Sequence, residues 1–264
     1  MAYNIFTDPR YVKNAIASAA REAPKTADSL DRLLTQQHTG RKIAEIGAGM
    51  GHLAVEMHKK NYLVAIEEPN RQSLDLLSER ERQFYDSLHQ RGLIFHEALW
   101  EFSRHLANQV RVGIFDAVYS NEGPLLAMRK NDGMHVVESY EAVNEGDKII
   151  RGSSLDRVLE CLRGLRVGIR PEGLLVLSVS PVPNGTWPFE YEGIPVDYDI
   201  KSDYDSKQGT VIRTRTLTEA GLKPESYPPQ RKLVMTLDEF KELAREAGFP
   251  RHNFSEDGKW FWIK

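Results

Sequence analysis

The chain has 264 residues, 41% of them hydrophobic and 28% charged, which is an ordinary balance for a globular protein with a substantial core. Its formal net charge of -3 leaves no basic field of the kind that sequence-independent nucleic-acid binding needs, so we expect no nucleic-acid partner. One cysteine, Cys161, excludes an intramolecular disulfide, and without a signal peptide or a long apolar stretch we expect a cytoplasmic protein with no membrane association.

The first part of the chain reads as helical. Through about residue 37 the apolar spacing predicts one or two helices, with a break at Pro24. Strands and helices then alternate. We expect strands at 42–46, 62–66, 93–96, 113–119 and 174–179, and helices at 51–60, across Leu74 to Leu88, and at 154–166. This alternation predicts a parallel sheet that is covered by helices on both faces.

The pattern changes after the fifth strand. Residues 181–235 are rich in proline, glycine and tyrosine and contain a predicted β-hairpin, which indicates an insertion on the sheet. A capping box at 236–239 then begins a last helix, and residues 251–263 predict a closing antiparallel hairpin. We therefore expect four parts: a helical cover (1–39), an α/β core (40–180), a β-rich insertion (181–235), and the last helix and hairpin of the core (236–264).

The segment IAEIGAGMG at 43–51 is the strongest functional signal. It predicts a buried strand that runs into three alternating glycines, with a helix after them. Glycines permit positive φ angles and let a ligand approach the backbone closely. The N-terminus of the following helix offers free N–H groups and the positive end of the helix dipole to a carboxylate or phosphate. Without further evidence, the same sequence also suits a tight strand–helix turn with no ligand.

The second strand ends in two acids, Glu67 and Glu68, followed by Pro69 and Asn70. A carboxylate at the tip of the strand beside a glycine loop can accept two hydrogen bonds from a ribose diol. We prefer Glu68 for this role because it directly precedes the Pro-Asn turn. Together, the loop and the acid favour a ligand that contains a nucleoside.

At this point the chain resembles the class I S-adenosyl-L-methionine (SAM)-dependent methyltransferase superfamily. The segment EIGAGMG at 45–51 looks like the first motif of that superfamily, Glu68 matches its ribose-binding acid, and Glu97-Ala98 matches its adenine site. The segment FDAVYSNE at 115–122 looks like its fourth motif. The cofactor-binding residues that this resemblance implies are Glu45, Gly47, Ala48, Gly49, Gly51, Glu68, Pro69, Glu97, Ala98, Ser120 and Asn121.

The resemblance implies a Rossmann-like, doubly wound α/β fold. Its sheet would have seven strands, a C-terminal antiparallel hairpin and the β-rich insertion after strand five. The implied activity is methyl transfer from SAM, with S-adenosyl-L-homocysteine as the product. The main competing fold is that of nicotinamide-dependent oxidoreductases. Their third glycine comes three positions after the second, where this chain has His52.

The residues after the fourth strand bear on the acceptor. The segment SNEGP at 120–124 lacks the Asn/Asp-Pro-Pro-Tyr signature of enzymes that methylate exocyclic adenine amines or side-chain amides, which puts those acceptors in doubt. The helical cover and the insertion are similar to those of small-molecule methyltransferases. We therefore expect in-line transfer to a small molecule. A protein or RNA acceptor, or SAM binding without methylation, is the alternative, and a homodimer is compatible with the sequence.

Candidate general bases also follow the fourth strand. A hydroxyl or ammonium nucleophile needs a base within hydrogen-bond reach, and we select His135 and Glu122, with Glu138 as a further candidate. The histidines are scattered with no pair at ligand spacing, so we expect no metal. Within the insertion, aromatic residues such as Trp187 and Tyr198 predict an acceptor-selecting wall; dimerisation or simple cover of the sheet is the competing interpretation.

Overall fold

The computed structural model describes residues 8–69, 79–108, 113–130, 133–138, 144–145, 148–149, 151–205 and 209–264. Its helices are α1 (Pro9–Gln36), α2 (His52–Lys59), α4 (Glu79–Gln90), α5 (Leu99–Asn108), α6 (Arg151–Gly168) and α7 (Leu237–Glu246). The core strands are β1 (Lys42–Ile46), β2 (Leu63–Glu67), β3 (Ile94–Phe95), β4 (Phe115–Ser120), β9 (Ile169–Pro181), β14 (His252–Phe254) and β15 (Trp260–Ile263). None of the helices in these ranges combines the length and the apolar character that a membrane-spanning helix needs.

The core sheet is parallel, as the sequence predicts. Strands β3, β2, β1, β4 and β9 pair in that order, all parallel, and β15 continues the sheet antiparallel to β9, with β14 beside it. All six residues of β4 are buried, because helices cover both faces of the sheet. One apolar cluster contains residues of α5, α6 and α7, and a second contains residues of α1, α2 and α4. The predicted closing hairpin is confirmed by the pairing of β14 with β15.

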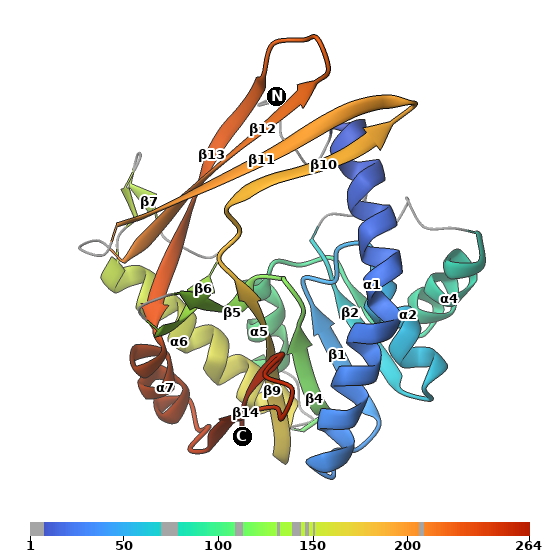
Figure 1. Cartoon of the computed structure of the whole chain (residues 1–264). Helices are drawn as coiled ribbons and strands as arrows, with labels where there is room; N and C mark the ends of the chain where they lie inside the picture. The colour runs from blue at the N-terminus through green and yellow to red at the C-terminus, as the bar shows by residue number, and fades with distance from the viewer. Residues whose placement is uncertain are drawn as a thin grey trace.

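The sheet is larger than the seven strands that we expected. It has thirteen strands in the described part of the chain, because a second, antiparallel half joins it. This half comprises β5 (Leu125–Lys130), β6 (Gly133–Glu138), β10 (Gly185–Tyr191), β11 (Ile194–Asp205), β12 (Thr210–Glu219) and β13 (Glu225–Thr236). Figure 1 shows β10 to β13 crossing above the carboxyl ends of β1 and β4. A separate two-stranded sheet pairs β7 (Asn144–Glu145) with β8 (Lys148–Ile149).

The hairpin of β5 and β6 connects the two halves, and we did not predict it from the sequence. Strand β5 pairs in parallel with the end of β9, and β6 pairs antiparallel with β5 on one side and β13 on the other. Our predicted elements include no strand between Leu125 and Glu138. Two apolar runs there flank the turn sequence NDG at 131–133, which is a hairpin signal.

Helix α1 is a single helix of 28 residues, so the expected break at Pro24 is not present. A proline inside a helix removes one backbone hydrogen bond. Packing compensates for that loss, because Ala27, Leu30 and Leu34 after the proline are completely buried in the core cluster beside α2. The other end of α1 contacts strand β10. The helix therefore spans from the α/β core to the antiparallel half of the sheet (Figure 1).

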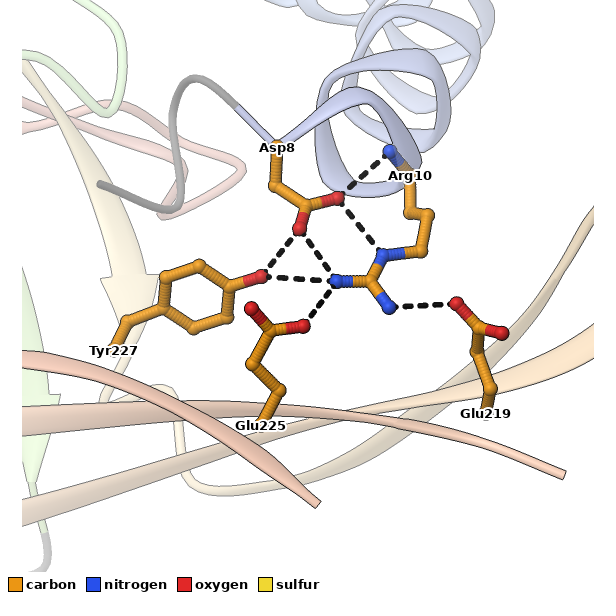
Figure 2. A network of polar contacts seen from close by, with 5 residues as sticks. All are labelled: Asp8, Arg10, Glu219, Glu225 and Tyr227. Atoms are coloured by element: carbon orange, nitrogen blue, oxygen red, sulfur yellow. Dashed lines mark hydrogen bonds and ion pairs between the residues drawn. The ribbon is translucent and has the colours of Figure 1, made fainter. Parts of the chain in front are cut away.

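A network of charged groups attaches the start of α1 to the β12–β13 hairpin (Figure 2). Arg10 pairs with Asp8 at 2.6 Å, with Glu219 at 2.6 Å and with Glu225 at 2.5 Å, and Tyr227 donates its hydroxyl proton to Asp8. Burial raises the pKa of Asp8, but the hydrogen bonds from Arg10 and Tyr227 outweigh it and hold that pKa well below its ordinary value. The stabilisation by Asp8 is therefore complete at neutral pH and is lost only as the pH falls below the ordinary carboxyl range.

We predict that Arg10→Met lowers the free energy of unfolding by about 2–3 kcal/mol, between the values for exposed and buried ion pairs. The variant leaves Asp8, Glu219 and Glu225 close together without their shared cation. Urea unfolding at neutral pH measures the change. Arg21→Met is the matched control on the same helix, because Arg21 is exposed and should contribute less than about 0.5 kcal/mol. Equal effects of the two variants would contradict the attachment role.

Candidate functional site

The glycine loop after β1 adopts the left-handed backbone that its sequence predicts. Gly47, Gly49 and Gly51 have φ angles of +65°, +57° and +66°. A Cβ atom on Gly47 would overlap Pro124, and one on Gly51 would overlap the hydroxyl of Tyr85. A Cβ on Gly49 would meet no atom within 4 Å. The first and third glycines are thus required by neighbouring parts of the chain, whereas Gly49 borders open space.

Both acids at the end of β2 reach this loop. Glu67 Oε2 accepts a hydrogen bond from the Gly47 amide at 2.7 Å, and Glu68 Oε2 accepts one from the Gly49 amide at 2.6 Å. The two side chains are buried. The structure therefore brings Glu68 together with the glycine loop, and it places Glu67 there as well. The choice of Glu68 over Glu67 as the ribose acid stays a prediction.

Glu45 adds a third carboxylate beneath the loop. It is buried, and Tyr119 donates a hydrogen bond to its Oε2 at 3.1 Å from the neighbouring strand β4. The pKa of Glu45 is raised to about 8, mainly by burial and to a smaller extent by the charge of Glu68. The hydrogen bonds from Tyr119 and from the Ala54 backbone oppose this rise. Burial and the charge of Glu45 likewise raise the pKa of Tyr119. This side of the site is therefore dry and rich in carboxylates.

The segment after β4 packs directly on the glycine loop. Ser120 is completely buried, and the Glu122 amide donates to Ser178 Oγ at 2.8 Å. A Cβ on Gly123 would overlap the carbonyl oxygen of Ile46. The predicted fourth motif, with Ser120 and Asn121 at the end of its strand, thus lies beside the first motif.

The predicted adenine residues lie at the start of α5. Glu97 Oε1 is 3.7 Å from His105 Nδ1 on that helix, and the Ala98 amide donates to Glu101 at 3.2 Å. His96, which precedes them, lies with Nδ1 3.2 Å from the carbonyl oxygen of Glu68. The segment therefore neighbours the tip of β2, while the Glu97 carboxylate faces α5. Pro69 is exposed.

The candidate bases lie on different elements: Glu122 follows β4, and His135 lies on β6. Ser180 of β9, Met128 of β5 and His135 of β6 are cross-strand partners in one row. Glu122 accepts a hydrogen bond from Ser180 at 3.3 Å, and the ring of His135 lies 5.7 Å from that of Tyr204. Two strand spacings, about 10 Å, separate Ser180 from His135. Glu122 and His135 thus face the same side of the sheet without forming a hydrogen-bonded pair. The side chain of Glu138 lies outside the described residues.

The inner face of the antiparallel half carries the predicted aromatic residues. Tyr198 packs with Tyr11 of α1 at 5.2 Å between ring centroids and with Trp187 at 6.3 Å. Phe189 and Tyr191 join the same apolar cluster. Part of the wall that we predicted is therefore packed against the first helix.

No protein-family model matches the chain, and no curated protein matches it either. Solved structures do match it over most of its length. DesVI from Streptomyces venezuelae has a TM-score of 0.61 at 12% identity, over 97% of this chain and 98% of that one. CalS10 from Micromonospora echinaspora, described as a SAM-bound amino pentose methyltransferase, has a TM-score of 0.57 at 15% identity, over 95% of both chains.

The fold of the present chain is that of the class I SAM-dependent methyltransferases. A third structure, the sugar N-methyltransferase KedS8 from a Streptoalloteichus species, agrees, with a TM-score of 0.55 at 13% identity over 90% of this chain and 85% of that one. The resemblance that the motifs indicated is thereby confirmed. At these identities the likeness concerns the fold.

The acid-rich part of this methyltransferase fold gives a pH prediction. Because the pKa of Glu45 rises from 4.5 to about 8 on folding, the stability associated with its protonated form is present below pH 4.5 and is lost as the pH rises through 8. We expect Glu45→Gln, which stays neutral, to gain stability relative to the natural protein between pH 5 and pH 9, by about 5 kcal/mol at most. Urea unfolding at several pH values measures this. The exposed Glu160→Gln is the control, and parallel pH curves for Glu45→Gln and the natural protein would contradict the prediction.

Proposed function

We propose that the chain is a SAM-dependent methyltransferase that transfers a methyl group to a small-molecule acceptor. The observation that carries this proposal is the glycine loop, where Gly49 borders open space and its amide meets the carboxylate of Glu68. The positive φ angle of Gly49 favours glycine by itself, as it does at Gly47 and Gly51. Unlike those two, Gly49 has open space where a side chain would stand, so a ligand can approach its backbone there.

The residues around the loop fit the chemical groups of SAM. We propose that the carboxylate of Glu68 accepts hydrogen bonds from the ribose diol; Glu67 lies beside it, and each acid accepts a backbone amide of the loop. The buried carboxylates of Glu67 and Glu68 favour a ligand that carries positive charge, and the charge of Glu68 contributes to the raised pKa of Glu45. Pro69, Glu97, Ala98, Ser120 and Asn121 complete the set of proposed cofactor-binding residues.

When bound, SAM supplies a methyl group on a sulfonium centre and needs no further activation. The protein's part is to hold the acceptor in line with the S–CH3 bond and to exclude water. The acceptor atom forms its new bond to carbon as the S–CH3 bond breaks, which leaves S-adenosyl-L-homocysteine. The proton that an amine or hydroxyl then loses passes to a base or to water, and Glu122 and His135 are our candidates for that base.

The antiparallel half supports a small acceptor. Residues 181–235 start at the carboxyl end of β9, and their strands cross above the carboxyl ends of the parallel strands, where ligands bind in doubly wound folds (Figure 1). Two of the similar structures are named as methyltransferases of an amino pentose and of a sugar nitrogen. We therefore propose an amine on a sugar-sized molecule as the first acceptor class to test. A protein or RNA acceptor, or binding without methylation, is the alternative.

The proposed function predicts transfer of labelled methyl from SAM to a metabolite fraction from which protein and RNA have been removed. Gly49→Val is the matched inactive variant: its side chain enters the open space, so the protein should fold but lose SAM binding in calorimetry. Gly92→Val is the control, since Gly92 also has a positive φ angle and open surroundings but lies before β3, away from the loop. Near-normal SAM affinity in a folded Gly49→Val protein would contradict the site.

The two acids of β2 give a further prediction. If Glu68 holds the ribose, Glu68→Ala should weaken SAM binding by about 1–3 kcal/mol, the range for hydrogen bonds to a charged group, and Glu67→Ala should weaken it less. Calorimetry with both variants measures the difference, with thermal unfolding as the check that each is folded. The reverse order would assign the ribose to Glu67, and no effect from either variant would exclude the ribose role of both.

A further inference from the structure

Two arginines lie buried on the inner face of β12. Arg213 and Arg215 are two residues apart, so they project from the same face of the strand, and their exposed fractions are 8% and 6%. A buried guanidinium is costly unless its charge is paired and its N–H groups are hydrogen-bonded. Each arginine in this position therefore requires a partner, and the two differ in whether the described structure supplies one.

Arg215 has partners within the sheet. Its Nε donates to the hydroxyl of Tyr198 at 3.0 Å, and its Nη1 donates to Gln230 at 2.7 Å. Arg213 is different: its Nε and Nη2 are both buried, and in the described part of the chain neither has a hydrogen-bond partner. These two nitrogens form one edge of the planar guanidinium. That edge matches two oxygens of a carboxylate or a phosphate.

The surroundings of Arg213 place it where three parts of the molecule meet. Burial and the charge of Arg215 lower its pKa, whereas Tyr198 of β11, Tyr11 of α1 and Glu122 of the segment after β4 raise it. In the register of the sheet, Arg213 lies opposite Ser202 of β11 and Gln230 of β13. Glu122 belongs to the segment that packs on the glycine loop, so Arg213 lies within electrostatic range of the proposed methyl-transfer site.

Apolar clusters lie on both sides of Arg213 along the sheet. Tyr198, Leu217 and Tyr227 belong to one, and Val211 belongs to the other, with Tyr204 packed against it. Between two apolar clusters a hydrogen bond to a charged group is little weakened by water. An oxyanion bound there would offset the unfavourable free energy of burying the guanidinium, which a neutral ligand could not do.

We propose that Arg213 recognises an oxyanion, a carboxylate or a phosphate, on the methyl acceptor through its Nε–H and Nη2–H groups. The assignment of the oxyanion to the methyl acceptor rests on the proposed function. The anion site itself rests on the buried and unpartnered edge of Arg213. The class of substrate that follows is a small molecule with an anionic group at one end and the methylated atom at the other.

The test is calorimetric titration of the full-length protein with inorganic phosphate and, separately, with malonate, at constant ionic strength. We expect the natural protein to bind at least one of the two, and Arg213→Met to bind it at least tenfold more weakly. Arg231→Met is the matched control, because it removes the same charge from the neighbouring strand β13. Arg231 lies opposite Ile212, whose side chain points to the other face of the sheet from that of Arg213. The tighter of the two anions identifies the group as phosphate or carboxylate.

Thermal unfolding separates recognition from a structural role. Removing a buried charge that has no partner should leave the Tm unchanged or raise it by about 2–4 °C, whereas removing a structural arginine should lower it. Arg213→Lys is the second variant: it keeps the charge but not the two-donor edge, so anion binding should weaken several-fold at an unchanged Tm. Neither titration uses SAM, so a failure of SAM binding would not affect the result. Undiminished anion binding by Arg213→Met, or no anion binding by the natural protein, would overturn the proposal.

Discussion

Strand β9 determines how the two halves of the molecule are placed, because it is hydrogen-bonded into both. Its middle residues pair with β4 on one side and β15 on the other, deep in the α/β core. Its last residues, Val179 to Pro181, pair with β5, from which the antiparallel half continues through β6 and β13. The chain then leaves β9 directly into β10. The antiparallel strands therefore cannot lie anywhere except beyond the carboxyl end of β9, which is where a doubly wound fold binds its ligands.

Helix α1 restrains the same arrangement from the opposite side. It packs on α2 at one end and meets β10 at the other, and Arg10 holds its first turn against Glu219 and Glu225. The covalent connection through β9 and the non-covalent connection through α1 thus attach the antiparallel half to the α/β core at two places. Tyr11, near the start of α1, packs on Tyr198 and contributes to the electrostatic surroundings of Arg213.

The sequence predicted the parts of the fold and site that local patterns encode. The strand that enters the glycine loop, the acids after β2 and the closing hairpin each occupy a short segment with its own signal. The β5–β6 hairpin also has such a signal, the sequence NDG at 131–133, which we did not use when we selected His135 as a candidate base. Pro24 predicted a break that helix packing overrides. Other features depend on which strands become neighbours, and no local pattern gives that: Tyr119 beside Glu45, and Arg10 beside Glu219.

The electrostatic contrast between the two sides of the site follows from these placements. Glu67 and Glu68 make the glycine-loop side negative, while Arg213 and Arg215 make the buried face of β12 positive. A cationic cofactor and an anionic group on an acceptor would each be attracted to a different side, so the two fields would separate the ligands and also orient the acceptor. Its anion would be drawn to β12, and its other end would point toward the carboxylates. Orientation of the acceptor is the main requirement of the proposed methyl transfer, because the sulfonium already activates the methyl group. The buried charges that are costly in the folded protein are thus the ones that its proposed ligands would neutralise.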